Sequence, residues 1–256
     1  MKRLLFVLGL MLTCTGCIHV ATLVTLKPDG SGTLDEEIGM NPQTLGMLAA
    51  FAGSGARAET RPDDIFSEAK AREQAEKMGV RFLSGTPIDT PSMKGYHARF
   101  AFDDVKTLKV RMDAARAGDD SRSQRDPFDF EFTRGASSST LTIRIPQDIQ
   151  RPPLAQMGQR PELTPEQTQQ MMAMMRPMLS GMFVDVAIAV DGQIVKTNAP
   201  FVDGTRVTLV QLDMNKVMQD DAAWTRLQQA KTPEEMRNIA GVKMTTEPTI
   251  TIEFRK

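Results

Sequence analysis

The chain has 256 residues and carries 31 Lys and Arg against 32 Asp and Glu, a formal net charge of −1. This balance gives no electrostatic reason to bind nucleic acid, which is recognised by surfaces with a large excess of basic residues. Aromatic residues make up only 5% of the chain. We therefore expect a core of aliphatic residues and methionine, in one large domain or two small ones.

The first 17 residues have the layout of a secretory signal peptide. Lys2 and Arg3 form a cationic start, residues 4–12 are apolar, and small residues precede Cys17. The apolar run is too short to span a bilayer. The small residues and the cysteine resemble the lipobox of bacterial lipoproteins. This resemblance implies that residues 1–16 are removed as a signal peptide and that Cys17 becomes the acylated first mature residue.

A lipid on Cys17 would place the protein in the bacterial cell envelope, anchored to a membrane and facing the periplasm. One acyl chain binds a membrane only marginally, so stable anchoring needs the several chains that the lipoprotein pattern implies. In lipoproteins sorted by the second mature residue, Ile18 in place of Asp would imply the outer membrane. The alternative is ordinary cleavage near Gly16, which would leave a soluble secreted protein with an N-terminal thiol.

Cys14 and Cys17 are the two cysteines of the chain. With Cys14 lost in the signal peptide and Cys17 acylated, the mature domain would have neither a thiol nor a disulfide. We therefore expect no thiol nucleophile and no cysteine metal cluster, and we expect core packing to hold the fold.

Alternating apolar and polar residues predict strands along much of the mature chain. The first predicted strand covers 18–26 and ends at Pro28-Asp29-Gly30, so residues 33–40 should return as its hairpin partner. Because this strand begins directly after Cys17, we expect the domain to lie close to the membrane. Further segments that alternate are 96–100, 128–132, 141–145, 182–190, 194–198, 207–212 and 250–254.

Turn residues predict how some of these strands connect. Asp191-Gly192 is the strongest hairpin signal, so segments 182–190 and 194–198 are expected to pair. Each strand is apolar on one face and polar on the other, which favours an antiparallel sheet with one covered face.

Capping residues predict the helices. Thr164-Pro165-Glu166-Gln167 and Thr232-Pro233-Glu234-Glu235 each place a capping threonine before a first-turn proline. Asn41-Pro42 should begin a short helix to Leu48, and Asp63 or Asp64 a helix that runs to Gly79.

The predicted fold class is therefore α+β, with predominantly antiparallel hairpins and several helices covering one face. We expect a single envelope domain over residues 17–256. The segment 146–163 contains four prolines and is the one reasonable internal boundary.

Three segments resemble the LppM-type group of bacterial lipoproteins, in which a strand, a Thr-Asn turn and a second strand recur behind a lipobox. The residues that carry this resemblance are Asp29-Gly30-Ser31-Gly32, the run 184–198 with its Thr197-Asn198 turn, and 204–209. The resemblance implies an envelope-anchored α+β domain, and it carries over no catalytic residues.

Methionine is unusually frequent, with 18 residues in the chain and a cluster in segment 171–182. Five of these share one face by helical spacing: Met171, Met174, Met175, Met178 and Met182. Core filling is the favoured interpretation, because an apolar stripe is how a helix usually covers a sheet. Two alternatives stay open, namely an adaptable groove for an amphiphile or a partner helix, and a Cu(I) site built from soft thioethers.

The remaining polar residues form no recognisable catalytic or cofactor set. His19 and His97 fit exposed strand positions. Adjacent carboxylates such as Glu36-Glu37 are expected to be solvated, since neighbours on a strand point to opposite faces and cannot flank a scissile bond. The sequence contains no phosphate loop and no dinucleotide fingerprint. We therefore expect no cofactor.

These features favour a non-enzymatic lipoprotein whose domain binds an envelope protein or an amphiphile at the periplasmic face of a membrane. A first alternative is a Met-rich lipoprotein that handles Cu(I). A second is an envelope hydrolase with a carboxylate site that the spacing does not reveal.

Overall fold

The computed structural model describes residues 18–46, 66–111, 126–146 and 179–256. The predicted signal peptide with Cys17, the Thr164 helix and residues 147–163 of the predicted boundary lie outside the described residues. So do the first four methionines of the predicted helical face, Met171, Met174, Met175 and Met178.

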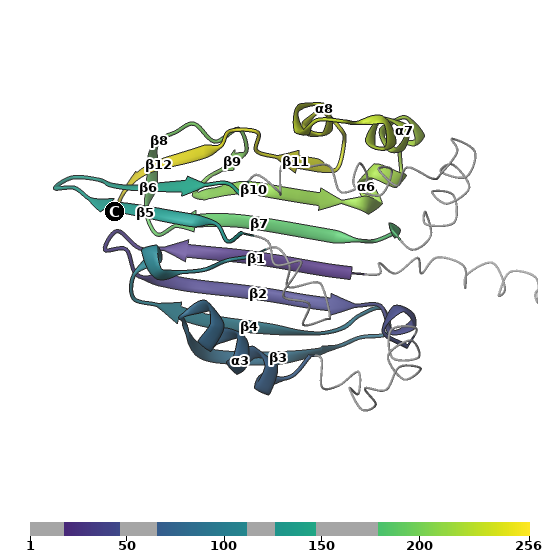
Figure 1. The fold of residues 1–256 in the computed structure, drawn as a ribbon, viewed down its shortest axis with the longest axis horizontal. Coiled ribbons are helices and arrows are strands. Elements are labelled where there is room, and N and C mark those ends of the chain that lie inside the picture. The colour runs from purple at the N-terminus through teal and green to yellow at the C-terminus, as the bar shows by residue number, and fades with distance from the viewer. Residues whose placement is uncertain (1–17, 47–65, 112–125, 147–178) are drawn as a thin grey trace, which may run out of the picture.

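The described strands form two sheets (Figure 1). The larger sheet has eight strands in the order β11-β10-β7-β1-β2-β4-β3, and β9 pairs with β10. Its strands are β1 (Ile18–Leu26), β2 (Gly32–Met40), β3 (Arg81–Asp89), β4 (Lys94–Phe102), β7 (Phe183–Val190), β9 (Val202–Asp203), β10 (Arg206–Asp213) and β11 (Val242–Met244). The smaller sheet has the order β5-β6-β12-β8, with β5 (Asp129–Arg134), β6 (Ser139–Arg144), β8 (Gln193–Thr197) and β12 (Thr249–Arg255).

The predicted β1–β2 hairpin is confirmed over its whole length, from Ile18 opposite Met40 to Leu26 opposite Gly32. Its turn closes where the Gly30 amide donates to the Lys27 carbonyl at 3.0 Å. On its other side, β1 pairs in parallel with β7, and this is the one parallel pair among the described strands. The antiparallel character of the predicted α+β fold is therefore confirmed.

The expectation that Asp191-Gly192 closes a hairpin is wrong. β7 already has β1 and β10 as its two neighbours, so it has no free edge for β8. β8 instead pairs with β12 in the smaller sheet. Gly192 has a φ of 153°, and a Cβ built on it would lie 2.2 Å from the Arg255 carbonyl oxygen. These two residues therefore form the corner at which the chain passes from one sheet to the other.

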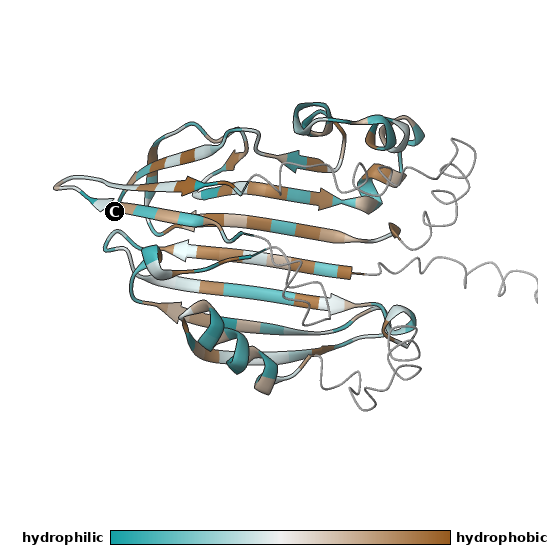
Figure 2. Ribbon diagram, in the orientation of Figure 1, coloured by the Kyte–Doolittle hydropathy of each residue, from teal (hydrophilic) through white to brown (hydrophobic). Residues whose placement is uncertain are grey.

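One face of the larger sheet carries the main core, and apolar and polar bands alternate along its strands (Figure 2). The smaller sheet contributes Leu141, Ile143 and Ile252 to this core, which also contains Val24 and Ile188 of the larger sheet. Helix α3 (Glu68–Met78) covers the rest of that face, over β3 and β4, and buries Ala71, Ala75 and Met78. The expectation that a helix covers one sheet face is thus confirmed for α3.

A second hydrophobic cluster lies beyond the ends of β7 and β10. It is built by three short helices and β11, the helices being α6 (Met214–Met218), α7 (Asp221–Gln229) and α8 (Pro233–Arg237). Trp224 is its largest side chain, and Met182 packs against it from the start of β7.

Helix prediction from caps is largely confirmed. Thr232 caps α8, and its side chain accepts from the Glu235 amide at 3.3 Å. Residues 42–46 are helical, and the Asn41 side chain accepts from the Gln43 amide at 2.7 Å. α3 ends at the predicted Gly79, which adopts the left-handed conformation that favours glycine. Its first residue is Glu68 rather than Asp63 or Asp64, because Ser67 is the capping residue.

The corner glycine provides a test of this topology. We expect Gly192→Ala to lower the free energy of unfolding by roughly 2–4 kcal/mol, because the new Cβ meets backbone that cannot move without unpairing the β12 end. The control is Gly204→Ala, at a φ of 57° with nothing within 4 Å of the new Cβ. In that variant the free energy of unfolding should fall by only about 1 kcal/mol, because alanine is disfavoured in this backbone conformation. Urea unfolding of both variants measures the difference in the free energy of unfolding. Equal losses in the two variants would contradict the close approach of Gly192 to the Arg255 backbone.

Candidate functional site

Glu36 is a charged residue on the covered face of the larger sheet. It follows Leu34 and precedes Ile38 in the alternation of β2, and only 5% of its surface is exposed. Asp35 and Glu37 point to the opposite face, as expected for neighbours on a strand. The expectation that Glu36 is solvated is wrong, because α3 lies over this part of the sheet.

A cavity of about 50 Å³ lies between α3 and the strands β2 and β4, and Glu36 is part of its wall. A single ordered water needs roughly 10–15 Å³ of such space, so the cavity has room for a small ligand or a few waters. It is partly open to solvent. Its walls include Ile38 from β2, Tyr96 and Phe100 from β4, and Phe66 and Lys70 from the helix side.

Glu36 has one hydrogen bond to a described residue. Its Oε2 accepts from Gln74 Nε2 at 3.0 Å, so one turn of α3 is tied to the centre of β2. An ionised carboxylate can accept about four hydrogen bonds. No other donor among residues 18–46, 66–111, 126–146 and 179–256 reaches Glu36. Its second oxygen, Oε1, therefore has no hydrogen-bond donor among these residues, and Glu36 lines the cavity.

Burial raises the pKa of Glu36 from its ordinary 4.5 to about 7. The charged form loses water contacts beneath α3, so the neutral form is favoured. Glu36 therefore titrates near neutral pH, unlike an exposed glutamate.

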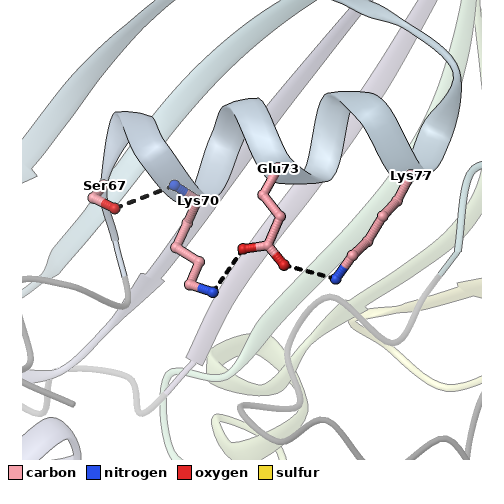
Figure 3. Close-up of polar contacts among 4 residues, drawn as sticks. All are labelled: Ser67, Lys70, Glu73 and Lys77. Carbon is pink, nitrogen blue, oxygen red and sulfur yellow. Dashed lines mark hydrogen bonds and ion pairs between the residues drawn. The ribbon is translucent and has the colours of Figure 1, made fainter. Parts of the chain in front are cut away.

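On α3, Glu73 lies between two lysines and pairs with both (Figure 3). Glu73 accepts from Lys70 Nζ at 2.7 Å and from Lys77 Nζ at 2.9 Å. These two bonds lower the pKa of Glu73 to about 2, so it remains ionised. Lys70 lines the cavity, and its ammonium group is paired with Glu73. The ammonium group of Lys70 is therefore paired with Glu73 and not with Glu36.

The opposite face of the larger sheet carries ion pairs. His19 lies 3.2 Å from Glu37, and its ring stacks on Phe183. Asp35 accepts from Arg99 Nε at 2.7 Å and lies 3.5 Å from His97, which is on the polar side as predicted.

A further pair on that face lies between neighbouring strands. Asp185 on β7 is bonded to Arg206 on β10, and Gln211 donates to it at 3.2 Å. Because these groups satisfy one another across neighbouring strands, their geometry fits a structural role.

The structure tests few of the site residues expected from sequence. Met182 packs against the second hydrophobic cluster, while the other four methionines of that face lie outside the described residues. The groove and the Cu(I) site therefore stay predictions, as does acylation of Cys17. Within the described ranges, no group of three or more His, Cys, Asp or Glu side chains could hold a metal ion. No helix in that part of the chain is long and apolar enough to cross a membrane.

Comparison with known proteins gives one distant likeness. No protein-family model matches the chain, and no curated protein matches it. Among solved structures, the NMR structure of the folded domain of Mycobacterium tuberculosis LppM is similar, with a TM-score of 0.38 and 13% identity. The likeness covers 94% of this chain and 91% of that chain. At this TM-score it carries no argument about function, which rests instead on the residues described above.

The pKa of Glu36 makes stability depend on pH. In the folded protein Glu36 keeps its proton up to about pH 7, whereas in the unfolded chain it loses it near 4.5. Between these values unfolding releases a proton, so the free energy of unfolding falls as pH rises. From pH 5 to pH 8 the loss should be about 2–3 kcal/mol.

Glu36→Gln isolates this contribution, because the amide cannot ionise and still fills the same space. Urea unfolding across that pH range should show the wild type losing more stability than the variant, by the amount given above. Above pH 7 the variant should be the more stable of the two. Parallel pH profiles would mean that Glu36 titrates as an exposed carboxyl.

Proposed function

We propose that this chain is a membrane-anchored bacterial lipoprotein whose α+β domain is a non-enzymatic binding module at the periplasmic face of a membrane. The observation that carries this proposal is the layout of residues 1–17, a short cationic and apolar leader that ends in small residues and Cys17. The position of β1 in the fold determines where such an anchor would hold the domain.

β1 begins at Ile18, the residue after Cys17, and lies between β2 and β7 inside the larger sheet. An acyl group on Cys17 would therefore be attached to an inner strand with no linker between them. A strand of nine residues is roughly 30 Å long. The β1–β2 turn would then lie about one strand length from the anchored end of the sheet.

The geometry of the cavity supports binding over hydrolysis. Hydrolysis of glycosidic bonds by paired carboxylates needs two carboxyl groups about 5–9.5 Å apart across the scissile bond. Among the described residues, Glu36 is the single acidic residue that lines the cavity. A buried carboxyl with one open acceptor beside aromatic walls is suited to holding a ligand.

Lipidation is tested on the N-terminus of the mature protein. Mass spectrometry of the chain purified from bacterial membranes should show Cys17 as the first residue, with its mass increased by several acyl chains. Cys17→Ser should abolish the acyl mass and release from the membrane fraction any protein that is still cleaved. Cys17→Ser protein with an intact leader should accumulate if the lipoprotein pathway alone processes the chain.

A mature N-terminus with a free thiol would contradict the anchor and indicate a secreted protein. The binding role is tested separately, by purifying the intact protein in mild detergent and identifying everything that is retained with it. A stoichiometric partner or ligand is expected. Catalytic turnover by the purified protein on a broad substrate panel would contradict the non-enzymatic role.

A further inference from the structure

The cavity under α3 contains a recognition group that the anchoring role does not explain. Glu36 Oε2 is held by Gln74, and Oε1 has no described hydrogen-bond donor. The cavity wall is formed largely by apolar and aromatic residues, among them Ile38, Phe66, Tyr96 and Phe100, beside the polar Ser67 and Lys70. A buried anion of this kind is stable only when a proton or a ligand compensates its charge.

The combination of one carboxylate with aromatic side chains in the cavity wall has a specific chemical complement. Ammonium groups are attracted to the faces of aromatic rings, and they donate charge-assisted hydrogen bonds to carboxylates. An anionic ligand would be repelled by ionised Glu36, and a neutral ligand would leave its charge uncompensated.

We propose that the cavity binds a small primary ammonium ligand, which donates a hydrogen bond to Glu36 Oε1 while Gln74 holds Oε2. This inference rests on the proposed binding role and is independent of the lipid anchor. It names the ligand class of the cavity beneath α3.

The dimensions of the cavity limit the size of this ligand. Its volume of about 50 Å³ admits the nitrogen and one or two carbons. Because the cavity is partly open, a longer alkyl stem can continue through the mouth towards solvent. A quaternary ammonium is a poor ligand on two counts, since it is larger and has no N–H to donate.

The chain's own cations do not occupy this position. Lys70 is the one cation among the cavity-lining residues that are described, and its Nζ lies 2.7 Å from Glu73. From β4 the titratable group that faces the cavity is Tyr96, whose pKa is raised by burial, so it stays neutral. From β1 the residue opposite Glu36 is Thr22, which does not titrate. Protonation of Glu36 itself is therefore the competing event.

Competition with a proton makes ligand affinity depend on pH. The ammonium binds the ionised form of Glu36, so the apparent dissociation constant is the intrinsic one divided by the ionised fraction. With a pKa of about 7 for Glu36, the affinity should increase about tenfold between pH 6 and pH 8.

The test is calorimetric titration of the full chain, in mild detergent, with methylammonium chloride as the probe. The wild type should bind with the tenfold pH dependence given above. Glu36→Gln should bind methylammonium at least tenfold more weakly than the wild type, and its affinity should not depend on pH. The matched control is Glu37→Gln, one residue along β2 on the opposite face, where the side chain pairs with His19. That variant should bind like the wild type.

Three outcomes would overturn the proposal. They are equal binding by Glu36→Gln and the wild type, equal binding of tetramethylammonium or potassium chloride, and no heat of binding at any soluble concentration of methylammonium. Far-UV circular dichroism and the unfolding profile show whether Glu36→Gln remains folded. If the ammonium proposal fails, the mass of the mature N-terminus can still show the acyl chains. The failure of this proposal is therefore distinguishable from failure of the lipoprotein assignment.

Discussion

The covered face of the larger sheet is the constraint on which the rest of the structure depends. The smaller sheet covers part of this face, and a second element covers the part over β3 and β4. Helix α3 does this with Met78 and two small side chains, Ala71 and Ala75, at its buried face. Small residues bring the helix close but fill little volume. The cavity and the buried Glu36 therefore lie beneath the helix.

Much of this fold can be predicted from sequence, because strand alternation and capping residues are local signals. The β1–β2 hairpin, the Thr232 cap and the Gly79 end of α3 follow from such signals. β3 was missed because it is an edge strand with a register shift between Phe82 and Ser84, so its apolar residues do not alternate. The pairing of β8 was mispredicted because a turn sequence does not reveal that both edges of β7 are occupied.

The sequence contains a signal for the burial of Glu36, but the prediction that Glu36 is solvated was wrong. In the alternation of β2, Leu34 and Ile38 are in phase with Glu36, so a charged residue occupies a position of the apolar series. That phase could have identified Glu36 as buried. What covers it could not be predicted, because the contact between Glu36 and Gln74 joins residues 38 apart through the packing of a helix on a sheet.

The parallel pair of β1 and β7 has a consequence for how the protein is made. His19 lies opposite Phe183, so the partner of the first strand is 164 residues further along the chain. When a chain crosses a membrane with its N-terminus leading, β1, β2, β3 and β4 emerge early. These strands can then pair with one another as hairpins. The other edge of β1 stays open until β7 has been delivered, and closing so long a loop is slow. If the chain is exported and anchored through Cys17 as proposed, this unpaired strand edge would lie next to the membrane attachment point, where chaperone protection would matter most.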